Sequence, residues 1–278
     1  MRISKRVTNT LLVILLAALT ALFILPIIIV LMNSFKGQFY ISAEPFKLPS
    51  PDTFVGLENY ISGIQKIGFF SALGYSLFIT VFSVLTILLF TSMASWYLAR
   101  VRTRTTKIIY YVLIFSMIVP FQMVMFTMSK IANVLHLENP IGIILIYLGF
   151  GAGLSVFMFY GFIRSIPLAI EEAAEIDGCT PPQRFFYVIL PILKPISITV
   201  AVLNAMWVWN DYLLPLLVIG SKYRTIPVAV QYLQGGYGSR DMGALMAMLV
   251  LAIIPIVLFY ALMQKHIIRG VVAGAVKG

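Results

Sequence analysis

The chain has 278 residues, of which 60% are hydrophobic and only 11% are charged, and its mean hydropathy is +0.98. A soluble globular domain carries about 25% charged residues, so this composition excludes that class and indicates a membrane protein. The formal net charge is +10, but the densest basic stretch, residues 100–107, contains no aromatic residue. We therefore expect no nucleic-acid binding.

Six long apolar stretches follow one another along the chain. About 20 residues of helix cross the hydrocarbon core of a bilayer, whereas a membrane β-strand needs only about ten. The stretches cover residues 7–35, 67–99, 108–129, 139–163, 195–221 (interrupted once, by Asp211) and 242–264. The sequence thus predicts an all-α polytopic membrane protein with six transmembrane helices, forming a single transmembrane domain over residues 1–278.

The first stretch, 7–35, follows Arg2, Lys5 and Arg6, as the apolar part of a signal peptide would. It is about twice as long as that part of a signal peptide and has no small-residue cleavage site. We expect a retained anchor.

Orientation follows from the Lys and Arg residues of the connecting loops, because cytoplasmic loops carry an excess of them. One side of the predicted membrane carries Arg2, Lys5, Arg6, Arg100, Arg102, Arg104, Lys107, Arg164, Arg184, Lys194, Lys265, Arg269 and Lys277. The other side carries Lys36, Lys47, Lys66, Lys130, Lys222, Arg224 and Arg240. We therefore expect both termini, and the loop between spans 4 and 5, to be cytoplasmic.

The first outside loop, 36–66, is long and rich in proline and aromatic residues, and the last one holds the sequence 234–241, with three glycines. Loops of such length are functional or disordered more often than not. Two readings stay open: a folded cap over the helix ends, or a docking surface for an extracytoplasmic partner.

Catalytic and metal-binding signatures are absent from the sequence. Cys179 is the single cysteine, and His136 and His266 fall on opposite predicted faces of the membrane, so no cysteine-rich or two-histidine metal site is expected. Nothing matches the glycine-rich phosphate loop G-x-x-x-x-G-K-[ST]. We expect no catalytic residue, no metal and no cofactor in this chain; a membrane enzyme would need convergent acids or histidines within its spans.

A short acidic helix is predicted in the loop 165–191, which holds four of the chain's ten acidic residues. Ser165 is the expected N-cap, and Gly178 is expected to end the helix in the left-handed conformation after about ten residues. Pro181 and Pro182 prevent its continuation, so a second segment should restart near 183–190 and lead into the fifth span. A helix–turn–helix along the cytoplasmic surface results.

The two faces of this helix suggest a docking role. Its acids form a carboxylate row at one-turn spacing, and its apolar residues can pack on membrane helices or in a partner groove; the acids are Glu171, Glu172 and Glu175, and the apolar residues are Leu168, Ala169, Ala173 and Ile176. A solvated interfacial helix would instead favour Lys and Arg, since anionic lipid repels carboxylates.

The pattern of this loop resembles a known family. It reads Glu172-Ala173-Ala174, three residues, Gly178, nine residues, Val188, one residue, Leu190-Pro191, and is similar to the EAA loop of binding-protein-dependent ABC importer permeases, with Val188 where Ile is usual. Two further stretches resemble the maltose-type carbohydrate permeases, specifically the six-span partner of the pair: Trp209-Asn210-Asp211-Tyr212-Leu-Leu-Pro215 and the last ten residues, 269–278.

The resemblance implies a subunit of a sugar importer, with oligosaccharide the preferred substrate, in a bacterial plasma or inner membrane. A second permease chain would complete the pathway, two ATPase subunits would bind ATP and Mg at the cytoplasmic face, and an extracytoplasmic solute-binding protein would deliver sugar. The ATPase-coupling residues implied are Glu171, Glu172, Ala173, Ala174, Asp177 and Gly178. Glu172 would pair with a basic ATPase group, and the alanines would let the helix seat closely.

Candidate substrate contacts lie in the fifth span. Asn204, Trp207, Asn210 and Asp211 are polar or aromatic residues at membrane depth, where such groups commonly mark a pathway. Packing is the competing reading, since Asp211 falls near the outer interface and the resemblance implies that the other permease chain holds most sugar contacts.

Residues 265–278 form a small, lightly charged C-terminal tail. It reads either as a disordered end or, by the resemblance, as a segment inserted between the two ATPase subunits.

The alternative function is a secondary solute transporter without an ATPase, which should show an inverted repeat. The first half contains no convincing repeat of 171–191.

Overall fold

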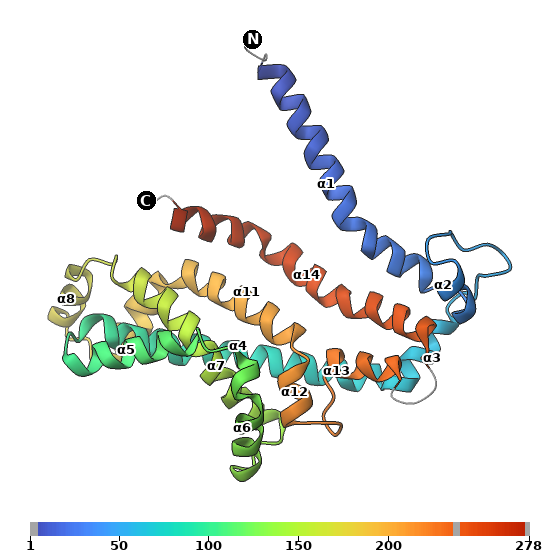
Figure 1. Cartoon of the computed structure of the whole chain (residues 1–278). Helices are drawn as coiled ribbons and strands as arrows, with labels where there is room; N and C mark the ends of the chain where they lie inside the picture. The colour runs from blue at the N-terminus through green and yellow to red at the C-terminus, as the bar shows by residue number, and fades with distance from the viewer. Residues whose placement is uncertain (1–4, 236–239, 276–278) are drawn as a thin grey trace. The chain divides into compact units, whose positions relative to one another are not determined.

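The computed structural model describes residues 5–235 and 240–275, and only the backbone of 5–8 and 265–275 (Figure 1). Within these ranges the chain is almost entirely helical, and pairing outside helices is limited to an isolated bridge between Lys36 and Phe54. The predicted all-α class is confirmed for this part of the chain.

In the described part of the chain, four helices are long and apolar enough to cross a membrane: Asn9–Asn33 of α1 (Lys5–Asn33), α4 (Phe69–Arg100), α7 (Pro140–Ile163) and Met242–Gln264 of α14 (Met242–Ala275). Two bent helix pairs meet the same criteria, which gives up to six spans if each pair is one span. The backbone of α14 stays helical to Ala275. The tail that we expected to begin at residue 265 is therefore a continuation of α14 as far as Ala275. Residues 276–278 lie outside the described part.

The chain forms two compact units, and the single transmembrane domain expected over 1–278 stays a prediction. The first unit comprises Met1–Phe70 and Ala229–Pro255, and the second comprises Ser71–Val228 and Ile256–Gly278. Each is described by itself.

The first unit contains α1, two short helices of the loop 36–66 and the start of α14. Asn59 ties this loop to the end of α1, because its Nδ2 donates to the carbonyl oxygens of Ser34 (2.8 Å) and Lys36 (2.9 Å). Lys66 forms an ion pair with Asp241, just before α14. The loop 36–66 is therefore folded onto its own unit; its helices are α2 (Gln38–Ala43) and α3 (Glu58–Ile67), and η2 (Tyr232–Gln234) lies near the start of α14.

The second unit contains α4, α7 and the helices between and after them. They are α5 (Arg104–Ser116), α6 (Phe121–Val134), α8 (Ala169–Ile176), α9 (Pro181–Gln183), η1 (Arg184–Ile189, a π-helix), α10 (Leu190–Ile192), α11 (Lys194–Asn210) and α12 (Leu213–Val218), and α13 (Ile226–Gln231) passes from this unit to the other.

The third predicted span, 108–129, is not one straight helix. Its apolar run divides into α5 and α6, which meet at 105°. The break falls at Pro120, whose extended backbone (φ −61°, ψ 133°) precedes α6. Proline lacks the N–H that a continuing helix requires, and it disfavours helical backbone in the residue before it.

The fifth predicted span, 195–221, is likewise interrupted. Helix α11 ends at Asn210, and Asp211 has extended backbone (ψ 124°). The Asp211 Oδ1 accepts hydrogen bonds from the backbone N–H groups of Leu213 (3.0 Å) and Leu214 (3.4 Å), which start α12. Asp211 thus caps a short helix, because an N-cap carboxylate satisfies N–H groups that have no partner within the helix.

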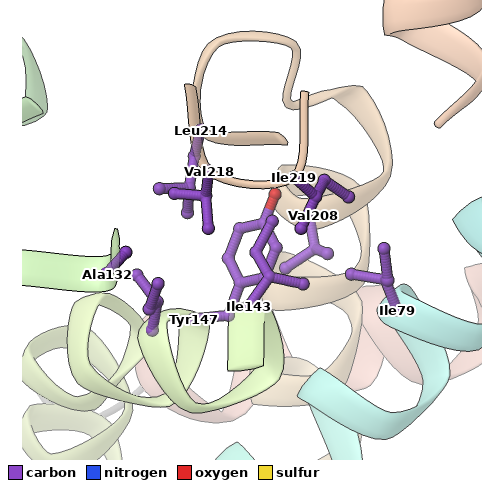
Figure 2. Packing of buried hydrophobic residues seen from close by; sticks show 9 residues of the cluster. Ile79, Ala132, Ile143, Tyr147, Val208, Leu214, Val218 and Ile219 are labelled. Carbon is purple, nitrogen blue, oxygen red and sulfur yellow. The ribbon is translucent and has the colours of Figure 1, made fainter. Parts of the chain in front are cut away.

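A buried apolar cluster surrounds this break. Figure 2 shows the Tyr147 ring of α7 in its middle, with the hydroxyl oxygen directed toward the segment that carries Val218 and Ile219. That hydroxyl donates to Asp211 Oδ2 at 3.1 Å. The Asp211 carboxylate therefore joins α7, α11 and α12.

We predict that Asp211→Ala lowers the free energy of unfolding by about 2 kcal/mol, because it removes a helix cap and leaves the buried Tyr147 hydroxyl without its acceptor. Asn210→Ala is the matched control, since Asn210 is exposed and its Nδ2 donates within its own helix, to Met206 O. Thermal unfolding in detergent measures both; equal losses in the two variants would contradict the capping role.

Candidate functional site

The predicted acidic helix exists as α8, but it starts later than expected. Ser165 is not its N-cap: the Ser165 hydroxyl donates back to the Phe162 carbonyl (2.7 Å), and α8 begins at Ala169, after Pro167. The predicted stop is confirmed, because Gly178 has φ +83°. The backbone N–H groups of Gly178 and Cys179 donate to carbonyls of the last turn, as in a left-handed helix end.

The second segment starts at Pro181 rather than at residue 183. Proline is tolerated at the first helical position, where its missing N–H has no partner anyway. The Gln183 side chain accepts from the Thr180 backbone N–H (2.8 Å), which caps the start. Through α9, η1 and α10 the segment reaches Ile192, and it then bends by 77° into α11. The predicted helix–turn–helix is present.

Glu171 points into the protein and not along an exposed row of acids. It is 4% exposed, and both its oxygens are occupied by groups of α4. Arg100 Nε donates to Glu171 Oε1 at 2.7 Å, and Trp96 Nε1 donates to Glu171 Oε2 at 2.8 Å. Arg100 also donates to the Ile166 carbonyl (3.1 Å). Glu171 therefore fixes α8 to α4 and does not offer its carboxylate to a partner in this structure; its assignment as a coupling residue stays a prediction.

Glu175 is held by the chain as well. Its Oε2 accepts from Arg184 NH1 at 2.6 Å, although the Glu175 side chain is largely exposed. Arg184 opens the π-helix η1, so this pair ties α8 to the segment that leads into α11. Helix α8 is thereby attached at two points: directly to α4, and through η1 to α11.

Glu172 lies on the opposite, exposed face of α8. Residues 171 and 174 share the buried stripe of the helix, so Ala174 is buried against this chain, whereas Glu172 and Ala173 face outward. Asp177 is also exposed. Neither Glu172 nor Asp177 forms an ion pair in the part of the chain that the structure describes. Of the expected coupling residues, Glu172, Ala173, Asp177 and Gly178 remain accessible to a partner.

The apolar face of α8 is exposed too. Ile176 is 86% exposed, and Leu168, Ala169 and Ala173 are likewise outside the core. They do not pack on this chain's own membrane helices, one of the two readings considered. The exposed face of α8 thus combines an acid with apolar side chains.

Sequence reasoning missed three residues: Arg100, Trp96 and Arg184. Arg100 and Arg184 entered only the charge balance of the loops. No spacing rule links Arg100 to Glu171, which lies 71 residues away. The signal available was charge complementarity between the acidic helix and the basic ends of neighbouring helices.

The candidate substrate residues do not form one site. Asn204 is buried, and its Nδ2 donates to Ser155 Oγ (3.1 Å) and to the Val200 carbonyl (2.9 Å), so it joins α11 to α7. Asp211 is the cap described above. Trp207 is 39% exposed and packs edge-on against Tyr147. Trp207 and the exposed Asn210 are the members that retain free surface.

Among the described residues no group of three or more His, Cys, Asp or Glu side chains is placed to hold a metal ion. The absence of a metal or cofactor stays a prediction.

Residues 91–273 match the family described as "Binding-protein-dependent transport system inner membrane component". Over 260 residues, 93% of both chains, the sequence is 40% identical to "Probable starch degradation products transport system permease protein AmyC" of Thermoanaerobacterium thermosulfurigenes. It is 36% identical over 261 residues, 92% of both chains, to "Multiple sugar-binding transport system permease protein MsmG" of Streptococcus mutans.

The fold is similar to a chain in the "Crystal structure of a bacterial ABC transporter involved in the import of the acidic polysaccharide alginate". The TM-score is 0.79 at 22% identity, and the match covers 95% of this chain and 98% of that one. At this identity the likeness concerns the fold.

We predict that Glu171→Ala destabilises the protein by about 3 kcal/mol or more, because it leaves Arg100 partly buried without its counter-charge. The neighbouring substitution Glu172→Ala removes the same group from an exposed position and should cost less than about 0.5 kcal/mol. Unfolding midpoints in detergent compare the two.

The double variant Arg100→Gln/Glu171→Gln tests whether the pair itself is responsible. It should lose less unfolding free energy than Arg100→Gln and Glu171→Gln lose together as single variants, since neither charge is then left without its partner. Additive losses would contradict the assignment of Arg100 as the partner.

Proposed function

The chain belongs to the family of binding-protein-dependent transport system inner membrane components, and we propose that it imports oligosaccharide as one half of a two-permease pathway. It is the permease subunit of an ATP-driven sugar importer and not a secondary transporter. The preference for oligosaccharide draws on its relatives, one of which is named for starch degradation products.

The observation that carries this proposal is the exposed face of α8. It presents Glu172 and Ile176 to the outside while Glu171 anchors the helix from behind. A helix held in this way can transmit a push from a partner. We assign that partner as one of two cytoplasmic ATPase subunits, which bind ATP and Mg themselves.

Coupling then proceeds through the two ion pairs. When ATP binding brings the ATPase subunits together, α8 moves as a rigid body. The Arg100–Glu171 pair carries that movement to α4, and the Arg184–Glu175 pair carries it to η1 and α11. Because α4 and α11 belong to the membrane part, their displacement changes which side of the pathway is open.

Six spans with both termini cytoplasmic fit this role. Counting each bent pair as one span gives the expected number, and the Lys and Arg balance places α8 on the cytoplasmic side of a bacterial plasma or inner membrane. Residues 36–66 then lie outside, with Phe39 and Phe46 exposed. We assign this folded loop as a docking surface for the solute-binding protein that the family's description implies.

The sugar pathway is the least supported part of the proposal. Trp207 and Asn210 keep exposed surface on α11, and an aromatic face beside an amide suits a sugar ring. Asn204 and Asp211 contribute by packing around them. The second permease chain supplies the remaining contacts.

The first experiment is affinity purification of the tagged chain in mild detergent, with mass spectrometry of the proteins that accompany it. A second permease and an ATPase are expected. Recovery of the chain alone while the ATPase is co-expressed would contradict the proposed partners.

We predict that Glu172→Lys abolishes co-purification of the ATPase, because it reverses the charge on the exposed face of α8. Glu138→Lys is the matched control: Glu138 is also an exposed acid, but it lies in the α6–α7 loop. Both variants should keep the wild-type unfolding midpoint, so a loss specific to Glu172→Lys reports docking and not folding.

A second variant perturbs the end of α8. Gly178→Val places a β-branched residue at φ +83°, where side chains are strained, and should reorient the exit from α8. In proteoliposomes it should uncouple ATP hydrolysis from transport. Full transport by both Glu172→Lys and Gly178→Val would overturn the assignment of α8 as the coupling helix.

A further inference from the structure

A polar cavity of about 420 Å³ lies among the ends of α4, α5 and α7. Three basic residues and three tyrosines line it: Arg102, Lys107, Arg164, Tyr110, Tyr111 and Tyr160. Its volume falls within the roughly 300–1,000 Å³ of small-ligand sites. None of the six residues belongs to α8 or to the candidate sugar path.

The three basic groups lack a counter-charge among the residues that the structure describes. No ion pair involves Arg102, Lys107 or Arg164 in the part of the chain that the structure describes. Among the acids of α8, Glu171 is engaged by Arg100 and Glu175 by Arg184, and Glu172 forms no ion pair with any described residue. Three like charges around one cavity repel one another, and a bound anion would remove that repulsion.

The walls of the cavity are held in place by packing. The Arg164 guanidinium lies over the Tyr160 ring, 5.8 Å from its centroid, and the Tyr160 and Tyr110 rings are 4.0 Å apart. Buried Thr106 donates to the Val101 carbonyl at 2.6 Å, which fixes the turn before α5. The walls formed by Tyr110, Tyr160 and Thr106 are thus held in place, and the exposed side chains of Arg102, Lys107 and Arg164 line the same cavity.

The position of the cavity indicates what it holds. Arg102 lies two residues after Arg100, which contacts α8, so the cavity is at the α8 end of the second unit. With α8 cytoplasmic, as in the proposed function on which this step rests, the cavity faces the inner-leaflet headgroups. Tyrosines concentrate at that depth, and basic pockets between helices there bind anionic headgroups.

We propose that this cavity binds a phosphate group, and that its source is the headgroup of an anionic phospholipid such as phosphatidylglycerol. Arg and Lys donors suit phosphate oxygens, and the tyrosine hydroxyls add donors around the same space. General cytoplasmic basicity does not explain the arrangement, because Arg104 belongs to the same basic cluster yet does not line the cavity.

The test uses the full-length chain, purified with any subunits that accompany it and delipidated in detergent. Unfolding is followed by intrinsic tryptophan fluorescence while phosphatidylglycerol, phosphatidylcholine or inorganic phosphate is titrated. Phosphatidylglycerol should raise the unfolding midpoint and phosphatidylcholine should not. The variants are Arg102→Gln, Lys107→Gln and Arg164→Gln, singly and as a pair of Arg102→Gln with Arg164→Gln, and Arg104→Gln is the matched control.

Each single substitution should raise the half-effective phosphatidylglycerol concentration about fivefold, and the pair about thirtyfold. Arg104→Gln should leave that concentration unchanged. A response to inorganic phosphate that depends on the same residues would support the phosphate site but assign it to a soluble anion. Equal phosphatidylglycerol responses in wild type, the pair and Arg104→Gln would overturn the proposal.

The readout does not involve sugar uptake or ATPase docking, so failure here leaves the proposed function standing. Conversely, a pocket-dependent response in a chain that recruits no ATPase would support the phosphate site while contradicting the coupling role of α8.

Discussion

The ion pair between Glu171 and Arg100 is the interaction on which the orientation of α8 depends. Helix α8 has eight residues, too few to be stable in water without tertiary contacts. Burying a carboxylate is costly unless its oxygens are satisfied, and here Arg100 and Trp96 occupy both of them. The buried acid therefore fixes the rotation of α8 about its axis, and that rotation decides that Glu172 and Ile176 face outward.

This rotation explains why the site could be predicted only in part. Helical periodicity predicted an acidic and an apolar face for α8, but the structure buries Glu171 with Ala174 and leaves Glu172 and Ile176 exposed. The positive φ at Gly178 followed from the glycine itself. The choice of inward face did not follow, because hydrophobicity would bury Ile176 and expose Glu171. The structure does the reverse, since a basic residue 71 positions earlier supplies the counter-charge. Such long-range pairs leave no local signal in one sequence.

The membrane helices, too, could be predicted only in part. Composition and run length identified every apolar stretch, because hydropathy measures how much polar surface a stretch contains. Hydropathy does not measure the direction of a helix, so the break at Pro120 disappeared inside a run read as a continuous span. Asp211 was noted as an interruption of the fifth run, but the start of a new helix there was not expected. Both breaks have a cause that is visible in the sequence: Pro120 cannot continue a helix, and Asp211 caps a new one.

The loop between α4 and α5 connects the Arg100–Glu171 ion pair to the basic cavity, neither of which was predicted from the sequence. Arg100, at the end of α4, holds α8, and Arg102 lines the basic cavity only two residues later. The excess of Lys and Arg in cytoplasmic loops accounts for the number of basic residues here. It does not explain why Arg100 contacts a carboxylate, Arg102 lines the cavity and Arg104 does neither. A ligand in the cavity would shift the placement of α8 only if it bound one conformation of this loop more tightly than another. Because the loop spans just three residues between the helices, any such difference would be imposed directly on the helix end that carries Arg100.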